Sequence, residues 1–554
     1  MTTTTTTPRL ALRAAAPGLL AGALLALLAA PTPLAAQDAS PTECAPTEEV
    51  DRYRLLRSLS LDLLGRIPTV AEYQLLDTVE EIDEPTLRAL LASEEHFAQV
   101  RQYHRALLWG SLDGVNSLAA GQRRLRLRRG PNIWRNPNAR ATYRGRNDVD
   151  CLDQPQTEWD ERGVPVPIRT FAGMNCRGGS CRQEGYVMVA PYWAPDTRIK
   201  VCAYDAQANA MGTDGQPCDV YNPNLACGCG PNLRQCSPGP NTAADRAMRE
   251  ALTEEPARLF EHIVRQGRSY FDAFTTNETL VNGASVHYYR HMSGVDVLSR
   301  GAVTYDPAMG ELPDLDFRDQ EDWRVVEREE AHAGVLTTYG FLMRFGSNRG
   351  RANRFYTAFR CEPFMPPAEG LPEEVEEDPS PNLRERTGCA GCHQTLEVAA
   401  AAWGRWRAST TFGLLRPVEV DMMGARAECA ACDTAGGTRC SAFCNSYFIT
   451  ADNGHPEELA TWRGFPQARA WLEESEATII EAGPEALVDE PMERQKVASC
   501  TVRNLAEHYL GRELSETELL EWVPALRREF EASDYDFTEL TYAIVSSEPY
   551  RTVR

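Results

Sequence analysis

The chain has 554 residues, of which 25% are charged, and its formal net charge is −22 at pH 7. At about 100 to 200 residues per domain, this length allows roughly three packed units with cores of their own. So acidic a chain repels nucleic acid, which we therefore exclude as a partner, although the charge also serves simply to keep a protein soluble.

Residues 1–36 have the pattern of a secretory signal peptide. Arg9 and Arg13 precede an apolar stretch, and small residues lead to a cleavage site after Ala36. The stretch is shorter than the roughly 20 residues that a membrane-spanning helix needs, so an uncleaved anchor is the weaker interpretation. The sequence predicts an extracytoplasmic protein, in the periplasm or secreted, whose mature chain has a net charge of −24 and no membrane span.

Residues 37–150 are predicted to form an N-terminal helical domain. Apolar residues follow the helical period up to Gly65, with Thr47 as the expected cap, and Thr69 with Glu72 predicts a capping box.

Histidines and a basic run in this domain have structural interpretations. We expect His96 and His104 to be surface or packing residues and not ligands. The basic run Arg123–Arg129 is interpreted as an ion-paired helix face and not as a binding patch.

Residues 151–241 form a predicted cysteine-rich insertion. The stretch is rich in Gly, Pro and Asn, contains eight cysteines, and has one strand-like run, Tyr186–Val189. Because it can bury little apolar surface, we expect disulfides to hold it, in preference to a metal site. Cys227 and Cys229 are too close together for an easy mutual bond, so we expect separate partners.

Residues 242–365 are predicted to form a central helical domain, with 272–281 as a loop. A compact apolar helix is expected over 335–345 and a basic helix over 349–359. One cluster could supply metal or haem ligands, but a packed aromatic helix end is the preferred interpretation; its members are His287, Tyr288, Tyr289, His291 and Met292. A Pro-rich acidic linker over 366–381 ends the domain.

Residues 382–470 contain the motif that carries chemistry. Cys389, Cys392 and His393 have the spacing of a c-type haem site, in which two thiols on one helical turn reach the two vinyl groups and the imidazole lies beneath the iron. The small residues between the two cysteines leave room for the macrocycle. The sequence therefore predicts one covalent haem c with His393 as the proximal ligand. The alternative is a disulfide between the two cysteines beside an exposed His393.

The sixth iron ligand is left open by the sequence. Met422 or Met423 is the candidate in a plausible loop, and other residues compete with them, namely His332, Met343, Met365 and His455. A filled sixth position restricts a haem to passing electrons, whereas an open one permits peroxide or small-molecule chemistry.

A second cysteine group follows the haem motif. Cys429, Cys432, Cys440 and Cys444 have the spacing of a zinc knuckle, but an exported protein favours two local disulfides that brace the haem segment. The C-terminal domain, residues 471–554, is predicted to be helical.

Residues that begin and end helices are clear in this last domain. A helix over 497–510 closes at Gly511, and Ser515 with Glu518 forms a second predicted capping box.

Several separated stretches of the chain carry a resemblance to one family; they are 54–69, 334–342, 351–361 with Pro366 and Pro367, 500–511, 534–550 and, more weakly, 274–283. They resemble the exported proteins of unknown function known as planctomycete-type cytochrome-c-domain proteins. The resemblance implies a c-type haem on Cys389, Cys392 and His393 and a redox role. The chain departs from the family in the segment after the haem motif, where only Gly-Arg-aromatic-Arg at 404–407 survives, and in the insertion 151–241.

The predicted fold is mainly α, with helical domains, a cysteine-rich irregular or small-β insertion and a cytochrome-c-like haem segment. The predicted function is electron transfer, or the redox part of an extracytoplasmic oxidative system, with a redox partner protein or an oxidase. The alternative is a disulfide-stabilised extracytoplasmic binding or scaffold protein without haem. Whether the chain is an enzyme is left open, since no distal His-plus-Arg signature, serine nucleophile elbow or nucleotide fingerprint stands out.

Overall fold

A computed structural model describes the part of the chain that carries the helices, the insertion and the Cys-x-x-Cys-His motif. The described ranges are 50–113, 124–137, 143–146, 149–207, 226–239, 242–293, 312–328, 331–365, 382–406, 424–467 and 477–552, with a few single residues between 211 and 218. The predicted signal peptide, the Thr47 cap, the linker and both Met422 and Met423 lie outside these residues.

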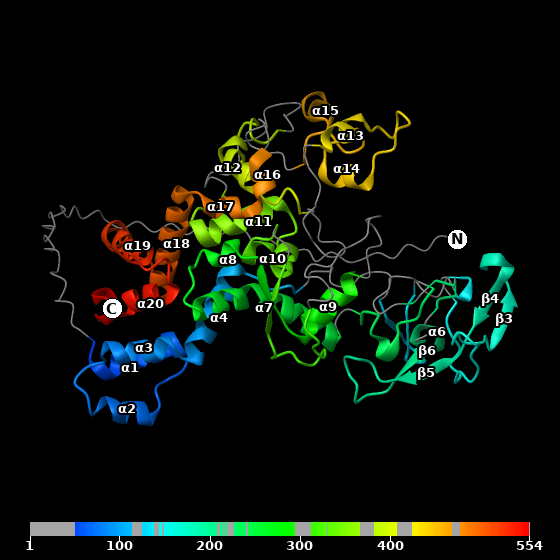
Figure 1. Cartoon of the computed structure of the whole chain (residues 1–554), viewed down its shortest axis with the longest axis horizontal. Coiled ribbons are helices and arrows are strands. Elements are labelled where there is room, and N and C mark those ends of the chain that lie inside the picture. Colours follow the sequence, from blue (N-terminus) through cyan, green and yellow to red (C-terminus); the bar gives the residue numbers. More distant parts are fainter. Residues whose placement is uncertain are drawn as a thin grey trace, which may run out of the picture. The chain divides into compact units, whose positions relative to one another are not determined.

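Four helices form the N-terminal segment (Figure 1): α1 (Arg52–Leu64), α2 (Val70–Leu76), α3 (Glu84–Leu91) and α4 (Glu94–Leu108). Asp51 caps α1, and Gly65 ends it in the left-handed conformation at φ 68°, where a side chain would be strained. The capping box of Thr69 and Glu72 is present at the start of α2, which confirms that prediction.

The central segment is built around one long helix. Its elements are α7 (Ala243–Arg265), α8 (Asp272–Thr275), β7 (Glu278–Val281), α9 (Gly283–Ser293), β8 (Arg324–Glu327), η4 (Gly334–Thr337), α10 (Tyr339–Arg344), α11 (Asn348–Phe355) and the π-helical η5 (Tyr356–Arg360). α4 packs along α7, and α7 also contacts β7, α9 and α10.

The predicted loop over 272–281 is wrong, because this stretch forms α8 and β7. β7 pairs antiparallel with β8, and Glu278 lies opposite Glu327. The hydrogen bonds of β7 therefore come from a strand more than 40 residues away, which the local polar composition does not indicate.

The C-terminal segment is helical, as predicted. Its elements are α16 (Ala477–Ala482), η7 (Gly483–Glu485), α17 (Ala486–Asp489), α18 (Pro491–Leu510), η8 (Glu518–Trp522), α19 (Val523–Ala532), α20 (Phe537–Ser546) and α21 (Glu548–Arg551). Gly511 ends α18 in the left-handed conformation, and Ser515 and Glu518 exchange the two hydrogen bonds of a capping box.

The N-terminal, central and C-terminal helices contribute to one hydrophobic core. Leu59 of α1, Phe260 of α7 and Ile544 of α20 are all fully buried members of it. The two ends of the described chain also meet, because the Tyr550 hydroxyl donates to the Asp62 carboxylate at 2.7 Å. These three segments are therefore stabilised together, although they lie hundreds of residues apart in the sequence.

The cysteine-rich insertion contains small sheets held by disulfides. Its elements, with the two strands that precede it, are β1 (Arg126–Arg128), β2 (Ile133–Arg135), β3 (Arg169–Ala172), η2 (Arg177–Gly179), β4 (Ser180–Gln183), β5 (Tyr186–Val189), β6 (Ile199–Cys202), α6 (Ala203–Ala206) and η3 (Pro231–Leu233). One sheet has the order β1-β2-β6-β5, and β3 and β4 form a hairpin. The single predicted strand is confirmed as β5.

All eight cysteines of the insertion are paired within it. The pairs are Cys151–Cys202, Cys176–Cys181, Cys218–Cys227 and Cys229–Cys236. Cys227 and Cys229 thus take different partners, as expected.

The described part of the basic run, residues 124–129, is not a helix face. Residues 126–128 form the edge strand β1, and the Arg128 guanidinium lies 3.2 Å from the Asp150 carboxylate. The expected ion pairing is present, but the alternation of Arg and Leu belongs to a strand.

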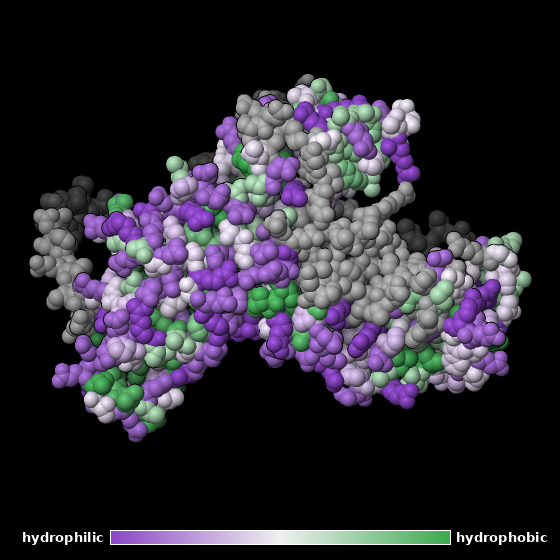
Figure 2. Space-filling model, in the orientation of Figure 1, coloured by the Kyte–Doolittle hydropathy of each residue, from purple (hydrophilic) through white to green (hydrophobic). Residues whose placement is uncertain are grey.

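Helices dominate the described residues, and the sheets are small. None of the described helices combines the length and the apolar character that crossing a bilayer requires. Figure 2 shows that hydrophilic residues cover most of the described part of one face, as the acidic composition suggests.

Candidate functional site

The Cys-x-x-Cys-His motif lies at the start of α12 (Ala390–Ala401). Cys389 is the residue before the helix, and its carbonyl accepts a hydrogen bond from the His393 amide at 3.0 Å. Cys392 and His393 consequently lie on the first turn, one turn from Cys389. The motif therefore has the local conformation that its spacing predicts.

The rest of α12 is anchored in the main core. Leu396 and Ala400 are buried there, and the Trp403 indole N–H donates to the Leu336 carbonyl at 3.0 Å. The Asn348 side chain of α11 donates to the Trp403 carbonyl, also at 3.0 Å. These contacts fix the helix that carries the motif.

The second cysteine group braces the other side of α12. It lies on α13 (Arg426–Ala431) and α14 (Ala442–Tyr447), which precede α15 (Pro456–Trp462), and forms the disulfides Cys429–Cys444 and Cys432–Cys440. Ala401 of α12 belongs to the same small buried apolar cluster as all four cysteines. The predicted pair of local disulfides is confirmed, so these sulfurs are not available as zinc ligands.

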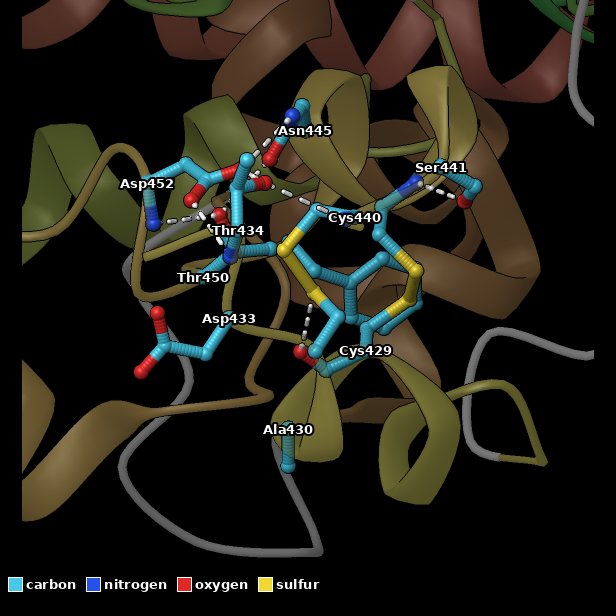
Figure 3. The surroundings of a disulfide bond; sticks show 12 residues. Cys429, Ala430, Asp433, Thr434, Cys440, Ser441, Asn445, Thr450 and Asp452 are labelled. Atoms are coloured by element: carbon cyan, nitrogen blue, oxygen red, sulfur yellow. Dashed lines mark hydrogen bonds between the residues drawn. A yellow bond between two sulfur atoms is a disulfide. The ribbon is translucent and has the colours of Figure 1, made fainter. Parts of the chain in front are cut away.

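Polar contacts fold the loops around these disulfides. Figure 3 shows Thr434 beside Asp452, and the Asp452 carboxylate accepts a hydrogen bond from the Thr434 hydroxyl at 2.6 Å. Ser441 caps α14, because its hydroxyl oxygen accepts a hydrogen bond from the Cys444 amide. The segment formed by α13, α14 and their connecting loops is therefore held together by its own disulfides and hydrogen bonds, next to α12.

Cys389 and Cys392 are the two described cysteines without a disulfide partner. The other fourteen described cysteines form seven disulfides, and the seventeenth cysteine, Cys44, lies outside the described residues. The disulfide between Cys389 and Cys392, which was the alternative interpretation of the motif, is not formed.

The surface above the first turn of α12 is open. Cys389, Cys392 and His393 are partly exposed, and Gly391 is exposed. A methyl group added at Gly391 would meet no atom of the described residues within 4 Å. The first turn of α12 is therefore accessible at Gly391.

His393 is held by a buried carboxylate that the sequence did not single out. Its Nδ1 lies 2.6 Å from Oε1 of Glu397, one turn further along α12, and the same oxygen lies 2.7 Å from Nε of Arg349 on α11. The Glu397 side chain is 6% exposed, and that of His393 is 20% exposed. The spacing of four residues was a signal for Glu397, whereas nothing local pointed to Arg349.

This arrangement leaves Nε2 of His393 as the ligand atom. The Arg349 guanidinium can only donate, so Oε1 of Glu397 is an acceptor and Nδ1 of His393 carries the proton that it receives. Nε2 then keeps its lone pair. Two unpaired thiols and an imidazole with a free lone pair, on one open helical turn, fit the donor set of a c-type haem.

His96 and His104 are buried packing residues, so the packing interpretation is confirmed and the surface one is wrong. Burial lowers the pKa of His96 to about 4 and that of His104 to about 3. The His104 ring stacks on Phe260 and lies within hydrogen-bond distance of the Tyr270 hydroxyl at 3.1 Å. Desolvation keeps both imidazoles neutral, and neither belongs to the motif.

The cluster around His287 is a packed aromatic group, as preferred from the sequence. His287 is buried with its ring centroid 3.9 Å from that of Tyr192 and 5.5 Å from that of Phe317. The side chains of His291 and Met292 lie outside the described ones.

The four other candidates for the sixth iron ligand are all among the described residues, and each has its own local environment. Met343 is buried with its sulfur 3.7 Å from the Tyr288 hydroxyl, and His455 begins α15, where its Nδ1 accepts from the Glu457 amide. His332 is buried near Trp406, and Met365 is exposed.

One further group of metal-binding residue types occurs among the described residues, at Cys151, Glu184 and Cys202. The two cysteines are bonded to each other, and Glu184 accepts from the buried guanidinium of Arg144. This group is therefore a structural ion pair beside a disulfide.

Comparison with known proteins found no relative: no protein family matches the sequence, and no curated protein and no solved structure matches the chain. The resemblance to planctomycete-type cytochrome-c-domain proteins thus stays a prediction from the residues.

Proposed function

We propose that the chain is an exported c-type haem protein that transfers electrons, with one haem bound to Cys389 and Cys392 and with His393 as the proximal iron ligand. The observation that carries the proposal is the pair of unpaired thiols on the first turn of α12, in a chain whose other described cysteines are all in disulfides. An oxidising compartment that formed seven disulfides would also pair these two, unless another bond held them. A thioether to haem is such a bond.

The attachment needs no oxidant or reductant. Each thiol adds across one vinyl C=C bond, so that sulfur bonds to one carbon and hydrogen to the other, and no electrons are gained or lost. A bound haem would supply one-electron transfer. Residues of this chain would hold it: Cys389 and Cys392 would supply the two sulfurs, and α12 would present the His393 imidazole to it.

Export is part of the proposal. The seven disulfides support an extracytoplasmic location, because cytosolic thiols are kept reduced, and covalent haem attachment takes place in the same oxidising space. The partner that delivers or removes the electron is a redox protein or an oxidase outside the cytoplasm.

The test is haem retention after denaturation. The exported chain, produced together with a haem-attachment system, should keep its Soret absorbance on the unfolded polypeptide, and Cys389→Ala with Cys392→Ala should abolish it. The matched control, Cys176→Ala with Cys181→Ala, removes two cysteines of the insertion and should keep the haem. A wild-type chain that is folded but retains no haem would overturn the proposal and favour the disulfide-stabilised binding protein.

A further inference from the structure

We propose that Glu397, paired with Arg349, is a positioning residue that fixes His393 for iron binding through Nε2 and lowers the reduction potential of the haem. The inference rests on the proposed function, because it concerns the proximal side of that haem. It adds a role for two residues that the motif itself does not contain.

The geometry restricts what Glu397 can do. One oxygen, Oε1, lies 2.6 Å from His393 Nδ1 and 2.7 Å from Arg349 Nε. Since that oxygen accepts from both, the imidazole is fixed in orientation and in tautomer. An imidazole that donates one ring N–H to a carboxylate is a more basic metal ligand through its other nitrogen.

Burial strengthens the effect. The Glu397 side chain is almost completely buried between α12 and α11, and a hydrogen bond to a charged group is stronger where water is excluded. The bond also lies within one rigid helix, at a spacing of four residues, so it does not depend on a mobile loop.

The two charges act on the iron in opposite directions. Negative charge shared with the imidazole favours the oxidised iron and lowers the potential. The Arg349 guanidinium draws on the same carboxylate oxygen and weakens that donation, although its side chain is 41% exposed and therefore partly screened. Removing Glu397 and removing Arg349 should consequently shift the potential with opposite signs.

This sign difference is the test. Redox titration of the haem protein should show a higher potential for Glu397→Gln and a lower one for Arg349→Gln. For Glu397→Gln we expect at least a tenfold change in the ratio of reduced to oxidised haem at a fixed ambient potential, which is 59 mV for one electron. The charge control is Glu385→Gln, an exposed glutamate four residues before Cys389, which should change this ratio much less.

The outcomes separate this inference from the proposed function. A chain without haem would defeat the proposed function before any potential is measured. Haem retained with unchanged potentials, or with shifts of the same sign in both variants, would reduce Glu397 and Arg349 to an ion pair between two helices and overturn the inference. If one variant fails to fold, the sign of the potential shift in the other variant still tests the inference. Loss of folding in both variants would overturn the inference.

Discussion

Most of the single buried polar side chains in this fold have a packing role, and His104 is an example. Its ring is enclosed by aromatic neighbours, and its pKa is lowered to about 3 by desolvation. The sequence could predict that this histidine packs, since it lies in an apolar helical pattern. It could not predict full burial, which depends on Phe260 and Tyr270, more than 150 residues away.

Acidification should destabilise the chain partly through His104. Its folded pKa lies below the unfolded value of about 6.5, so the stability that it contributes is present above that value and is lost as pH falls toward 3. Between about pH 7.5 and pH 4.5, the wild type should lose about 3 kcal/mol more free energy of unfolding than His104→Gln. Denaturant unfolding at each pH measures this difference, and parallel pH profiles for the two proteins would contradict the prediction.

In the candidate site too, the sequence could indicate only the residues that lie close together along the chain. The spacing of Cys389, Cys392 and His393 predicted that they lie on one helical turn, and α12 places them there. Glu397 could have been found by the same periodicity. Arg349 could not, because it reaches the site from another helix, across a gap of 48 residues.

At the scale of elements, local rules predicted helix ends well. The capping box at Thr69, the left-handed Gly65 and the closure at Gly511 all depend on neighbours within four residues. The pairing of β7 with β8 depends on a distant strand instead, and it was missed.

Two elements on either side of α12 in the sequence are joined by a disulfide that was not predicted from the sequence. Cys361, at the end of η5, bonds to Cys500 in the middle of α18, 139 residues later. Any haem on α12 lies within the segment that this bond closes. The bond therefore joins η5 directly to α18.

Loss of this bond should destabilise the chain more than loss of a short one. For a closed loop of 139 residues, Cys361→Ala with Cys500→Ala should lower the free energy of unfolding by about 5 kcal/mol. The matched pair Cys176→Ala with Cys181→Ala, separated by 5 residues, should cost about 2 kcal/mol. Denaturant titration under oxidising conditions compares them, and equal losses would contradict the loop-length argument.

At the scale of the whole molecule, the N-terminal, central and C-terminal helices build one core around α7, and the insertion is held by its own four disulfides. Composition and helical periodicity were enough to predict a mainly helical protein with a cysteine-held insertion. Which helices share a core was not predictable, because distant segments meet through apolar faces that look alike in sequence.

The cysteines provide the most direct link between the whole molecule and its proposed role. The described structure pairs fourteen of them and leaves unpaired the two that the motif assigns to haem. Helical packing and disulfide bracing place these two on an open turn.

The decisive measurement is the intact mass of the exported chain after denaturation, full reduction and alkylation. We expect a polypeptide that still carries the mass of one haem and that has alkyl groups on every cysteine except Cys389 and Cys392. A chain of bare polypeptide mass with alkyl groups on all seventeen cysteines would contradict the proposed haem attachment.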